Sequence, residues 1–383
     1  MQLRKLFFSI GIGTTVGIVL SLLACNAGES TSSFAEKVND LLTEELGAGG
    51  PGGAVLILKN DEVVFSEGYG TANLETGEVI TTKTLFNLGS ISKTFVSNGI
   101  LLLQERGKLS VEDPLSAYFP DFAHPEIAQK IKISHLLTHT SGLPDNRQVS
   151  RDPEFYLTAK DEENWAPELL VDSLNFAPGT NYQYSNPAFN GLALIIEQVS
   201  GQKWQDFIIE NIIRPSGMAS STITDGPHPE SGVAHAYVQG DGGQWAEDDY
   251  GEEPTFAAAG NGGVWSTVEE LARYEQALRA AVFLPAAVIE NSRTPKNDLP
   301  VKALSCLEDR TWNLGYSWFI SQTDSGVKLV GHSGTQGGFY ANYIAVPDQQ
   351  ILFVMLANFP CDRQKISLQI MQWIEEELFE TAD

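Results

Sequence analysis

The chain has 383 residues, enough for two or three domain-sized units, and 42% of them are hydrophobic, which is typical of a globular protein with a substantial core. Its 49 acidic and 24 basic residues give a formal net charge of −25. A surface this acidic repels phosphate backbones and anionic headgroups, which argues against nucleic-acid binding.

The first 25 residues have the pattern of an export signal. Two basic residues precede an apolar run from Leu6 to Leu23, and Ala24 and Cys25 follow it. The Leu-Leu-Ala-Cys sequence that ends at Cys25 resembles the lipobox of bacterial lipoproteins. This resemblance implies a signal peptide over residues 1–24, a lipid on Cys25 and a polar tether over 25–33. An ordinary cleaved signal and an uncleaved membrane span are the alternatives.

Hydrophobic periodicity predicts strands near both ends of the chain, with helices before and after them. In chain order we expect a helix over 34–46, strands over 54–58 and 63–65, helices over 90–106, 190–199 and from 266 onward, strands over 316–320, 327–330, 339–346 and 351–356, and a helix over 364–378. The helix over 90–106 is apolar almost all round, so we expect it to be buried.

This order of elements predicts an α/β (α+β) fold, in which one antiparallel sheet with flanking helices is built from both chain ends. Its α/β part would comprise residues 34–85 and 266–383. A mostly helical part over 86–265 would be inserted between them, within a single domain over 34–383. The seam between the two parts is the expected place for a site.

A Ser-x-x-Lys sequence stands at the head of the long apolar helix. Ser90 and Lys93 lie one helical turn apart, so the lysine amine can approach the serine hydroxyl. A serine hydroxyl is a poor nucleophile until a neighbouring group takes its proton, and a desolvated lysine can do so. Two further matches, beginning at Ser200 and Ser325, fall in predicted loops. Ser90 is therefore the candidate nucleophile.

Two other polar motifs are candidates for the same site. Tyr184-Ser185-Asn186 lies in a polar stretch, where a tyrosine can shuttle a proton and an asparagine can hold a substrate amide. Gly331-His332-Ser333-Gly334-Thr335 ends an apolar strand run, and its small residues would let an extended substrate lie along the strand edge. Taken alone, the first motif is more often packing and the second an exposed strand end.

Together, the three motifs resemble the signatures of the serine hydrolases related to class C β-lactamases and serine D,D-carboxypeptidases. That family carries Ser-x-x-Lys, Tyr-x-Asn and a Lys/His-x-Gly strand in this order. The resemblance covers nearly all of the chain from Phe34 onward. Supporting stretches similar to the family's are 86–95, 135–143, 260–263 and 331–334.

The resemblance implies a catalytic role for each matched residue. Ser90 would form the acyl-enzyme, and Lys93 and Tyr184 would share the general base and acid work. Asn186 would orient the substrate amide. Whether the lysine or the tyrosine takes the first proton stays open, because a coupled pair titrates as a unit. The family's chemistry requires no cofactor and no metal.

The third motif supplies the substrate strand. The backbone N–H groups of Ser90 and Thr335 would form an oxyanion hole, and Ser333 and Gly334 would lie along the bound substrate. His332 stands where class C β-lactamases have a lysine, so a fixed positive charge is missing. Histidine here resembles the family's peptidases, D-amino-acid-specific peptidases and esterases, and predicts weak or absent β-lactamase turnover.

Other candidate sites are weaker. His135 and His139 are spaced like zinc ligands, but the glutamate of a His-Glu-x-x-His motif is missing, and the stretch resembles a structural segment of the family. If Cys25 carries a lipid, Cys306 and Cys361 remain. In an exported protein they form either a disulfide or two free thiols.

We therefore predict an exported serine hydrolase, lipid-anchored to the cell envelope, that acts through a Ser90 acyl-enzyme on a peptide, amide or ester. The preferred hypothesis is a D,D-carboxypeptidase-like or D-amino-peptidase-like activity, and the alternatives are an esterase or a β-lactamase. Outside enzymes, the alternative is a catalytically silent penicillin-binding or sensor lipoprotein. Expected partners are a small-molecule or peptide substrate and, through the lipid alone, a membrane. If the cell has two membranes, the anchor would lie on the outer-membrane or periplasmic side. The chain has no Gly-x-Ser-x-Gly nucleophile elbow, which argues against an α/β-hydrolase.

Overall fold

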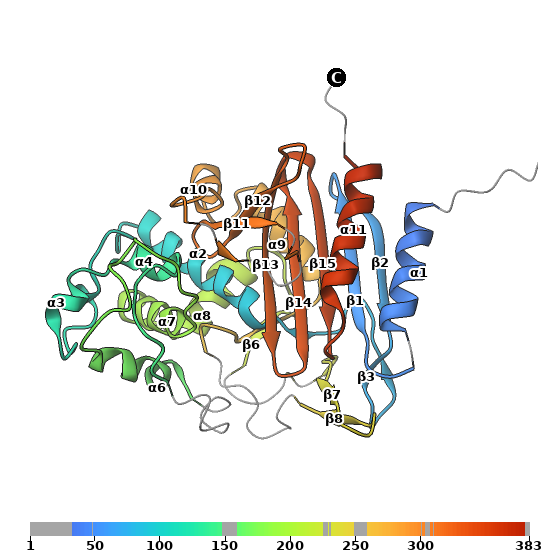
Figure 1. The fold of residues 1–383 in the computed structure, drawn as a ribbon, viewed down its shortest axis with the longest axis horizontal. Coiled ribbons are helices and arrows are strands. Elements are labelled where there is room, and N and C mark those ends of the chain that lie inside the picture. The colour runs from blue at the N-terminus through green and yellow to red at the C-terminus, as the bar shows by residue number, and fades with distance from the viewer. Residues whose placement is uncertain are drawn as a thin grey trace, which may run out of the picture. The chain divides into compact units, whose positions relative to one another are not determined.

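An eight-stranded antiparallel sheet forms the centre of the structure (Figure 1). Its strands are β1 (Gly53–Lys59), β2 (Glu62–Tyr69), β10 (Val301–Lys302), β11 (Thr311–Leu314), β12 (Phe319–Gln322), β13 (Lys328–Gln336), β14 (Phe339–Val346) and β15 (Ile351–Ala357). Their spatial order is β10-β11-β12-β13-β14-β15-β1-β2. β1 pairs with β15 along its whole length, which confirms a sheet built from both chain ends.

The computed structural model describes residues 33–47, 49–147, 159–224, 229, 231–248, 259–299, 301–302, 307–308 and 310–379. From Phe34 onward the chain forms one compact unit. The predicted signal peptide, Cys25, nearly all of the tether and Cys306 lie outside the described residues. Cys361 is a free thiol. Within the described ranges, no helix combines the length and apolar character needed to cross a bilayer.

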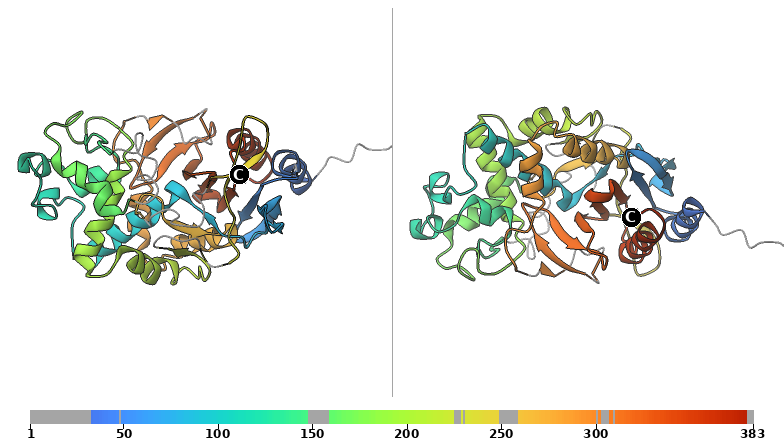
Figure 2. Two further views of the ribbon diagram at one scale, coloured as in Figure 1. Left: turned by 90° about the horizontal axis from the view of Figure 1, so that it is seen from below. Right: turned by 90° about the horizontal axis from the view of Figure 1, so that it is seen from above.

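Helices cover both faces of the sheet. On one face, α1 (Phe34–Leu46) and α11 (Arg363–Glu377) lie side by side (Figure 2). On the other, α9 (Val268–Arg279) packs against β1 and β15. β1 reads as a continuous apolar run because it is buried on both sides. Val55 and Ile57 belong to the hydrophobic core beneath α1 and α11. The alternate residues Ala54, Leu56 and Leu58 belong to a separate hydrophobic core on the side of α9.

Most of the remaining helices gather in the segment between β5 (Phe86–Asn87) and α9. They are α2 (Ser92–Glu105), α3 (Pro125–Ala128), α4 (Ile133–Leu137), α6 (Asp161–Trp165), α7 (Pro187–Ser200) and α8 (Trp204–Ile208). As the sequence predicts, α2 is buried, and every residue from Ser92 to Leu103 belongs to the interior.

The same segment also contains short strands. They are β6 (Thr222–Ile223), β7 (Tyr237–Gln239), β8 (Trp245–Glu247) and β9 (Val264–Ser266). β9 pairs with β5 on one side and with β6 on the other. Beyond this segment, β3 (Thr71–Asn73) and β4 (Glu78–Val79) form a small hairpin, and α10 (Ala286–Ser292) follows α9.

Several element boundaries differ from the prediction, and three of the differences have a clear physical reason. The predicted strand over 316–320 is wrong at its start, because Ser317 has φ of 64° and turns the chain before β12. β13 continues six residues past its predicted end, since Gly331 to Gln336 keep pairing with β14. α7 begins at Pro187 rather than residue 190, with proline at the first helical position.

Candidate active site

Ser90 and Lys93 lie together at the start of α2. Ser90 is in a single 3₁₀ turn, Gly89–Ile91, which leads directly into the helix. Lys93 Nζ lies 2.9 Å from Ser90 Oγ. The lysine is fully buried and the serine is half-buried. The regular helix thus begins two residues after Ser90, and the local spacing that the sequence indicates is preserved through the turn.

The Lys93 amine is fully buried, which disfavours its charge. Nζ also donates a hydrogen bond to the Asn261 carbonyl at 2.7 Å, and it lies 5.2 Å from the centre of the Tyr184 ring and 5.8 Å from that of Phe189. No carboxylate among the described residues pairs with it. Burial, and then the positive charge of Arg147, hold the pKa of Lys93 well below its usual range. This lowered pKa favours the neutral form of the amine.

β13 passes directly over the Ser90 turn, at a distance that only glycine permits. A Cβ atom on Gly334 would lie 1.9 Å from the Leu88 carbonyl oxygen and 3.2 Å from Ser90 N. A Cβ atom on Gly89, whose φ is 50°, would lie 2.7 Å from Thr335 N. The backbone amides of Ser90 and Thr335 are therefore close neighbours.

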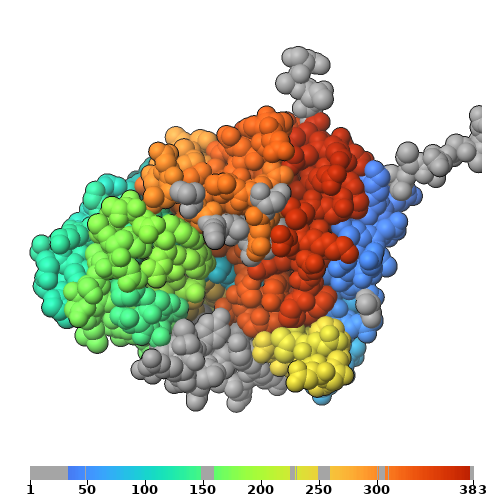
Figure 3. Space-filling model, in the orientation of Figure 1, coloured from blue at the N-terminus to red at the C-terminus, as the bar shows by residue number. Residues whose placement is uncertain are grey.

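One edge of β13 ends its strand pairing early. β12 pairs with it only as far as Gly331, which lies opposite Phe319, whereas β14 pairs with it to Gln336. Among the described residues, no strand covers the other edge of 332–336. The surface is hollowed between the helical part, in green, and β13 and β14, in orange-red, with cyan atoms at its floor (Figure 3).

His332 is a buried, neutral imidazole. Its Nδ1 donates to the Ser333 carbonyl at 2.7 Å, which leaves the lone pair on Nε2. Burial is the main cause that lowers the pKa of His332 to about 3. Nε2 is buried without a hydrogen-bond partner in the described part of the chain. His332 therefore does not supply the fixed positive charge that a lysine would carry at this position.

Tyr184 and Asn186 lie just before α7, and His139 holds this segment in place. The Tyr184 ring stacks on the His139 ring with centroids 4.3 Å apart. The backbone N–H of Ser185 donates to His139 Nδ1 at 3.0 Å. Asn186 is the N-cap residue of α7, and its carbonyl accepts from Phe189 N.

His139 is thus a structural support of the Tyr-Ser-Asn segment. Burial is the main cause that holds its pKa well below the usual range, so it is neutral. Within the described residues, no group of three or more histidine, cysteine, aspartate or glutamate side chains is arranged to hold a metal ion. His139 has a φ of 54°, a strained backbone conformation that is uncommon for a residue other than glycine.

Arg363 was not found by sequence reasoning. It begins α11, and its Nη1 donates to the Gly334 carbonyl at 2.9 Å and to Thr335 Oγ1 at 3.1 Å. Its guanidinium carbon lies 4.8 Å from the centre of the Tyr340 ring. A fixed positive charge therefore stands beside the substrate strand predicted from the sequence. No local motif marks it, because the contact joins residues 29 positions apart.

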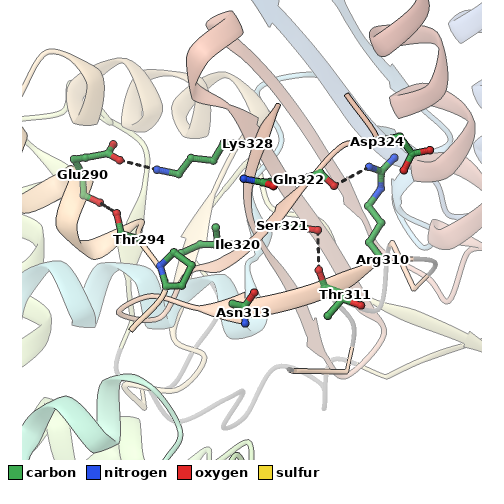
Figure 4. Close-up of a pocket in the computed structure, with 11 residues that line it drawn as sticks. Glu290, Thr294, Arg310, Thr311, Asn313, Ile320, Ser321, Gln322, Asp324 and Lys328 are labelled. Carbon is green, nitrogen blue, oxygen red and sulfur yellow. Dashed lines mark hydrogen bonds and ion pairs between the residues drawn. The ribbon is translucent and has the colours of Figure 1, made fainter. Parts of the chain in front are cut away.

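A separate cavity of about 680 Å³ lies between α10 and strands β11 to β13 (Figure 4). None of the predicted site residues lines it. Its two cations are paired, Lys328 with Glu290 at 2.8 Å and Arg310 with Glu375 at 2.9 Å. Lys328 belongs to the third Ser-x-x-Lys match, and its ion pair gives this residue a structural explanation.

A family model described as Beta-lactamase matches residues 38–364. The chain belongs to the beta-lactamase family. It is 28% identical to penicillin-binding protein 4* of Bacillus subtilis, over 80% of this chain and 68% of that one. It is 26% identical to the D-alanyl-D-alanine-carboxypeptidase/endopeptidase AmpH of Escherichia coli, over 94% and 93%.

The fold agrees with this family. The octameric penicillin-binding protein homologue from Pyrococcus abyssi superimposes with a TM-score of 0.76 at 24% identity, covering 90% of this chain and 79% of that one. This likeness confirms the predicted antiparallel sheet with flanking helices. The protein is a serine hydrolase of the beta-lactamase family, whose members act through an acyl-enzyme.

Proposed function

We propose that the protein is a peptidase that forms an acyl-enzyme on Ser90 and cleaves peptides with a D-amino acid and a free C-terminal carboxylate, as a D,D-carboxypeptidase does. The observation that carries this proposal is the buried Lys93 amine 2.9 Å from Ser90 Oγ. A neutral amine at this distance accepts the hydroxyl proton as the oxygen attacks the substrate carbonyl.

The proposed reaction balances within the site. The Ser90 oxygen bonds to the carbonyl carbon, and the oxyanion accepts hydrogen bonds from the N–H groups of Ser90 and Thr335. Lys93 and Tyr184 carry the proton to the leaving amine as the peptide bond breaks. Water then attacks the ester, gives one proton back to Ser90 and releases the acid. Asn186 holds the substrate amide in line.

Arg363 supports a substrate with a carboxylate. Because His332 and His139 are neutral, the guanidinium beside Thr335 supplies positive charge next to the edge of β13. A substrate lying along this edge would bring its C-terminal carboxylate toward Arg363, where a charge-assisted hydrogen bond is favourable. The activity named for AmpH fits this substrate class.

The Arg363→Gln variant tests this assignment. We expect kcat/KM to fall about tenfold or more for a peptide with a free C-terminal carboxylate, mainly through KM, because one charged contact is worth about 1.5–3 kcal/mol. The C-terminally amidated peptide serves as the matched substrate and should lose less than threefold. Equal losses on both peptides would remove Arg363 from substrate recognition.

Turnover of four substrates distinguishes the peptidase from the esterase and β-lactamase alternatives. Purified protein is given a D-Ala-D-Ala peptide, a D-amino-acid amide, a p-nitrophenyl ester and a penicillin. Ester turnover with no peptide turnover would establish the esterase instead. Rapid loss of the penicillin would establish a β-lactamase, whereas a long-lived penicillin adduct of the expected mass is consistent with the peptidase.

We also propose export with a lipid on Cys25, supported by the Leu-Leu-Ala-Cys sequence after an apolar run. In cells fed radiolabelled palmitate, the full chain should take up label and sediment with membranes. The Cys25→Ser variant should lose the label, because it removes the only thiol at the predicted cleavage position. Label that persists in this variant would contradict the assignment.

A further inference from the structure

A buried series of hydrogen bonds connects α6 to the Lys93 amine. Asp161, the first residue of α6, is 4% exposed. Its Oδ1 accepts from Asn190 Nδ2 at 2.7 Å and from the backbone N–H of Gly260 at 2.9 Å. Asn190 Nδ2 also donates to Asn261 Oδ1 at 3.2 Å. The Asn261 carbonyl accepts from Lys93 Nζ.

These contacts fix the position of the 260–261 backbone. Gly260 lies against α7 so closely that a Cβ atom would stand 2.6 Å from the Phe189 carbonyl oxygen and 2.7 Å from Ala193 Cβ. Packing against α7 and the hydrogen bond from the Gly260 amide to Asp161 together hold the loop. Asn261 is then tied at two points, through its side chain to Asn190 and through its carbonyl to Lys93.

The direction of the Lys93 lone pair depends on this carbonyl. A neutral amine has two N–H bonds and one lone pair, so an acceptor that fixes one N–H also restricts where the lone pair points. With one N–H on Asn261, rotation about the last bond of the side chain is limited, and the lone pair can stay directed at Ser90 Oγ. Small errors in such alignment cost large factors in rate.

We propose that Asp161 is a positioning residue for the catalytic base, which orients Lys93 through Asn190 and the Gly260–Asn261 backbone. This inference rests on the proposed role of Lys93. Asp161 touches no substrate and acts as a hydrogen-bond acceptor. Burial raises the pKa of Asp161 to about 7, and Oδ1 can accept both hydrogen bonds in either protonation state.

The test compares Asp161→Leu, which removes the acceptor at similar volume, with Asp161→Asn, which keeps an acceptor oxygen. The matched control is Glu270, another buried carboxylate near a helix start, which accepts from the backbone N–H groups of Ser220 and Ser221. Glu270→Leu likewise removes the acceptor of several donors, which are the backbone N–H of Ser220 and the backbone N–H and hydroxyl of Ser221. Each kcat is expressed per active site, titrated with a fluorophosphonate that labels reactive serines.

We expect Asp161→Leu to lower kcat per active site at least tenfold with KM changed less than threefold. Asp161→Asn should stay within threefold of wild type, as should Glu270→Leu. Asn190→Ala, which leaves the Asp161–Gly260 bond in place, should also lower kcat at least tenfold, and it serves if Asp161→Leu does not fold.

Wild-type kcat per active site in Asp161→Leu or in Asn190→Ala would show a purely structural role and overturn the inference. So would an equal loss in the Glu270→Leu control. Activity that survives in Ser90→Ala would instead overturn the proposed function. The two failures are therefore distinguishable.

Discussion

Replacing Ser90 by alanine is expected to lower kcat by about 10⁴- to 10⁶-fold, because a nucleophile removed from a covalent mechanism cannot be bypassed by the remaining groups. The same change should abolish labelling by a fluorophosphonate and the mass increase that follows its addition. Both are measured on purified protein, the first by steady-state turnover and the second by intact-protein mass.

Ser200→Ala is the matched control. Ser200 also begins a Ser-x-x-Lys sequence, but its hydroxyl lies next to the backbone of Gln202 at the end of α7. Full activity and labelling are expected. If labelling persists in Ser90→Ala at a different residue, the nucleophile assignment is wrong. If no serine reagent labels the wild-type protein, the alternative of a silent binding protein regains its support.

Contacts that are local in sequence could be predicted, and this explains why the proximity of Ser90 and Lys93 was expected. Their separation of three residues places them together in any helical start. Sheet strands were recognised from apolar runs, but β11 was missed, since its Thr-Trp-Asn-Leu sequence is short and half polar. The turn at Ser317 depends on a positive φ, for which serine gives no sequence signal.

Residues that contact the site from distant parts of the sequence could not be predicted from local patterns. Asp161 lies 29 residues before Asn190 and 99 before Gly260, and nothing in their local sequence connects them. Arg363 lies one residue before the predicted final helix, and the sequence assigned it no role. These residues are brought together by tertiary packing, which hydrophobic periodicity and motif spacing cannot predict. Family resemblance predicted the residues that would react, and the structure adds the neighbours that we propose position them and supply charge.

Lys93→Met is expected to have two opposite effects, a loss of activity and a gain in stability. Without a proton acceptor, kcat should fall by about 10²- to 10⁴-fold. Methionine has similar length and no ionisable group, so it removes the cost of burying an amine whose pKa is well below its usual range. Turnover and the midpoint of thermal unfolding measure the two effects on one preparation.

The direction of the stability change follows from proton binding. Between the folded-state pKa and about 10.4, the unfolded chain carries a protonated Lys93 and the folded protein does not. The unfolded state therefore binds more protons, and wild-type stability rises with pH through this window. At pH 7 Lys93→Met should unfold at a higher temperature than wild type, and the difference should shrink as pH approaches 10.

The pH dependence of catalysis has the same origin. The active form contains the neutral amine, so wild-type kcat/KM should fall on the acid side as Lys93 becomes protonated, with a midpoint well below 10.5. Lys328→Met is the control. Lys328 pairs with Glu290 at the cavity between α10 and β11 to β13, so its replacement should leave the pH profile of kcat/KM unchanged.

A Lys93→Met protein less stable than wild type at pH 7 would mean that the native lysine is charged and stabilised by partners. The lone pair would then be absent from the resting enzyme. Tyr184 would become the group that takes the first proton from Ser90, with the Lys93 ammonium favouring its phenolate. The sign of one unfolding-temperature difference therefore separates the two orders of proton transfer that the motifs leave open.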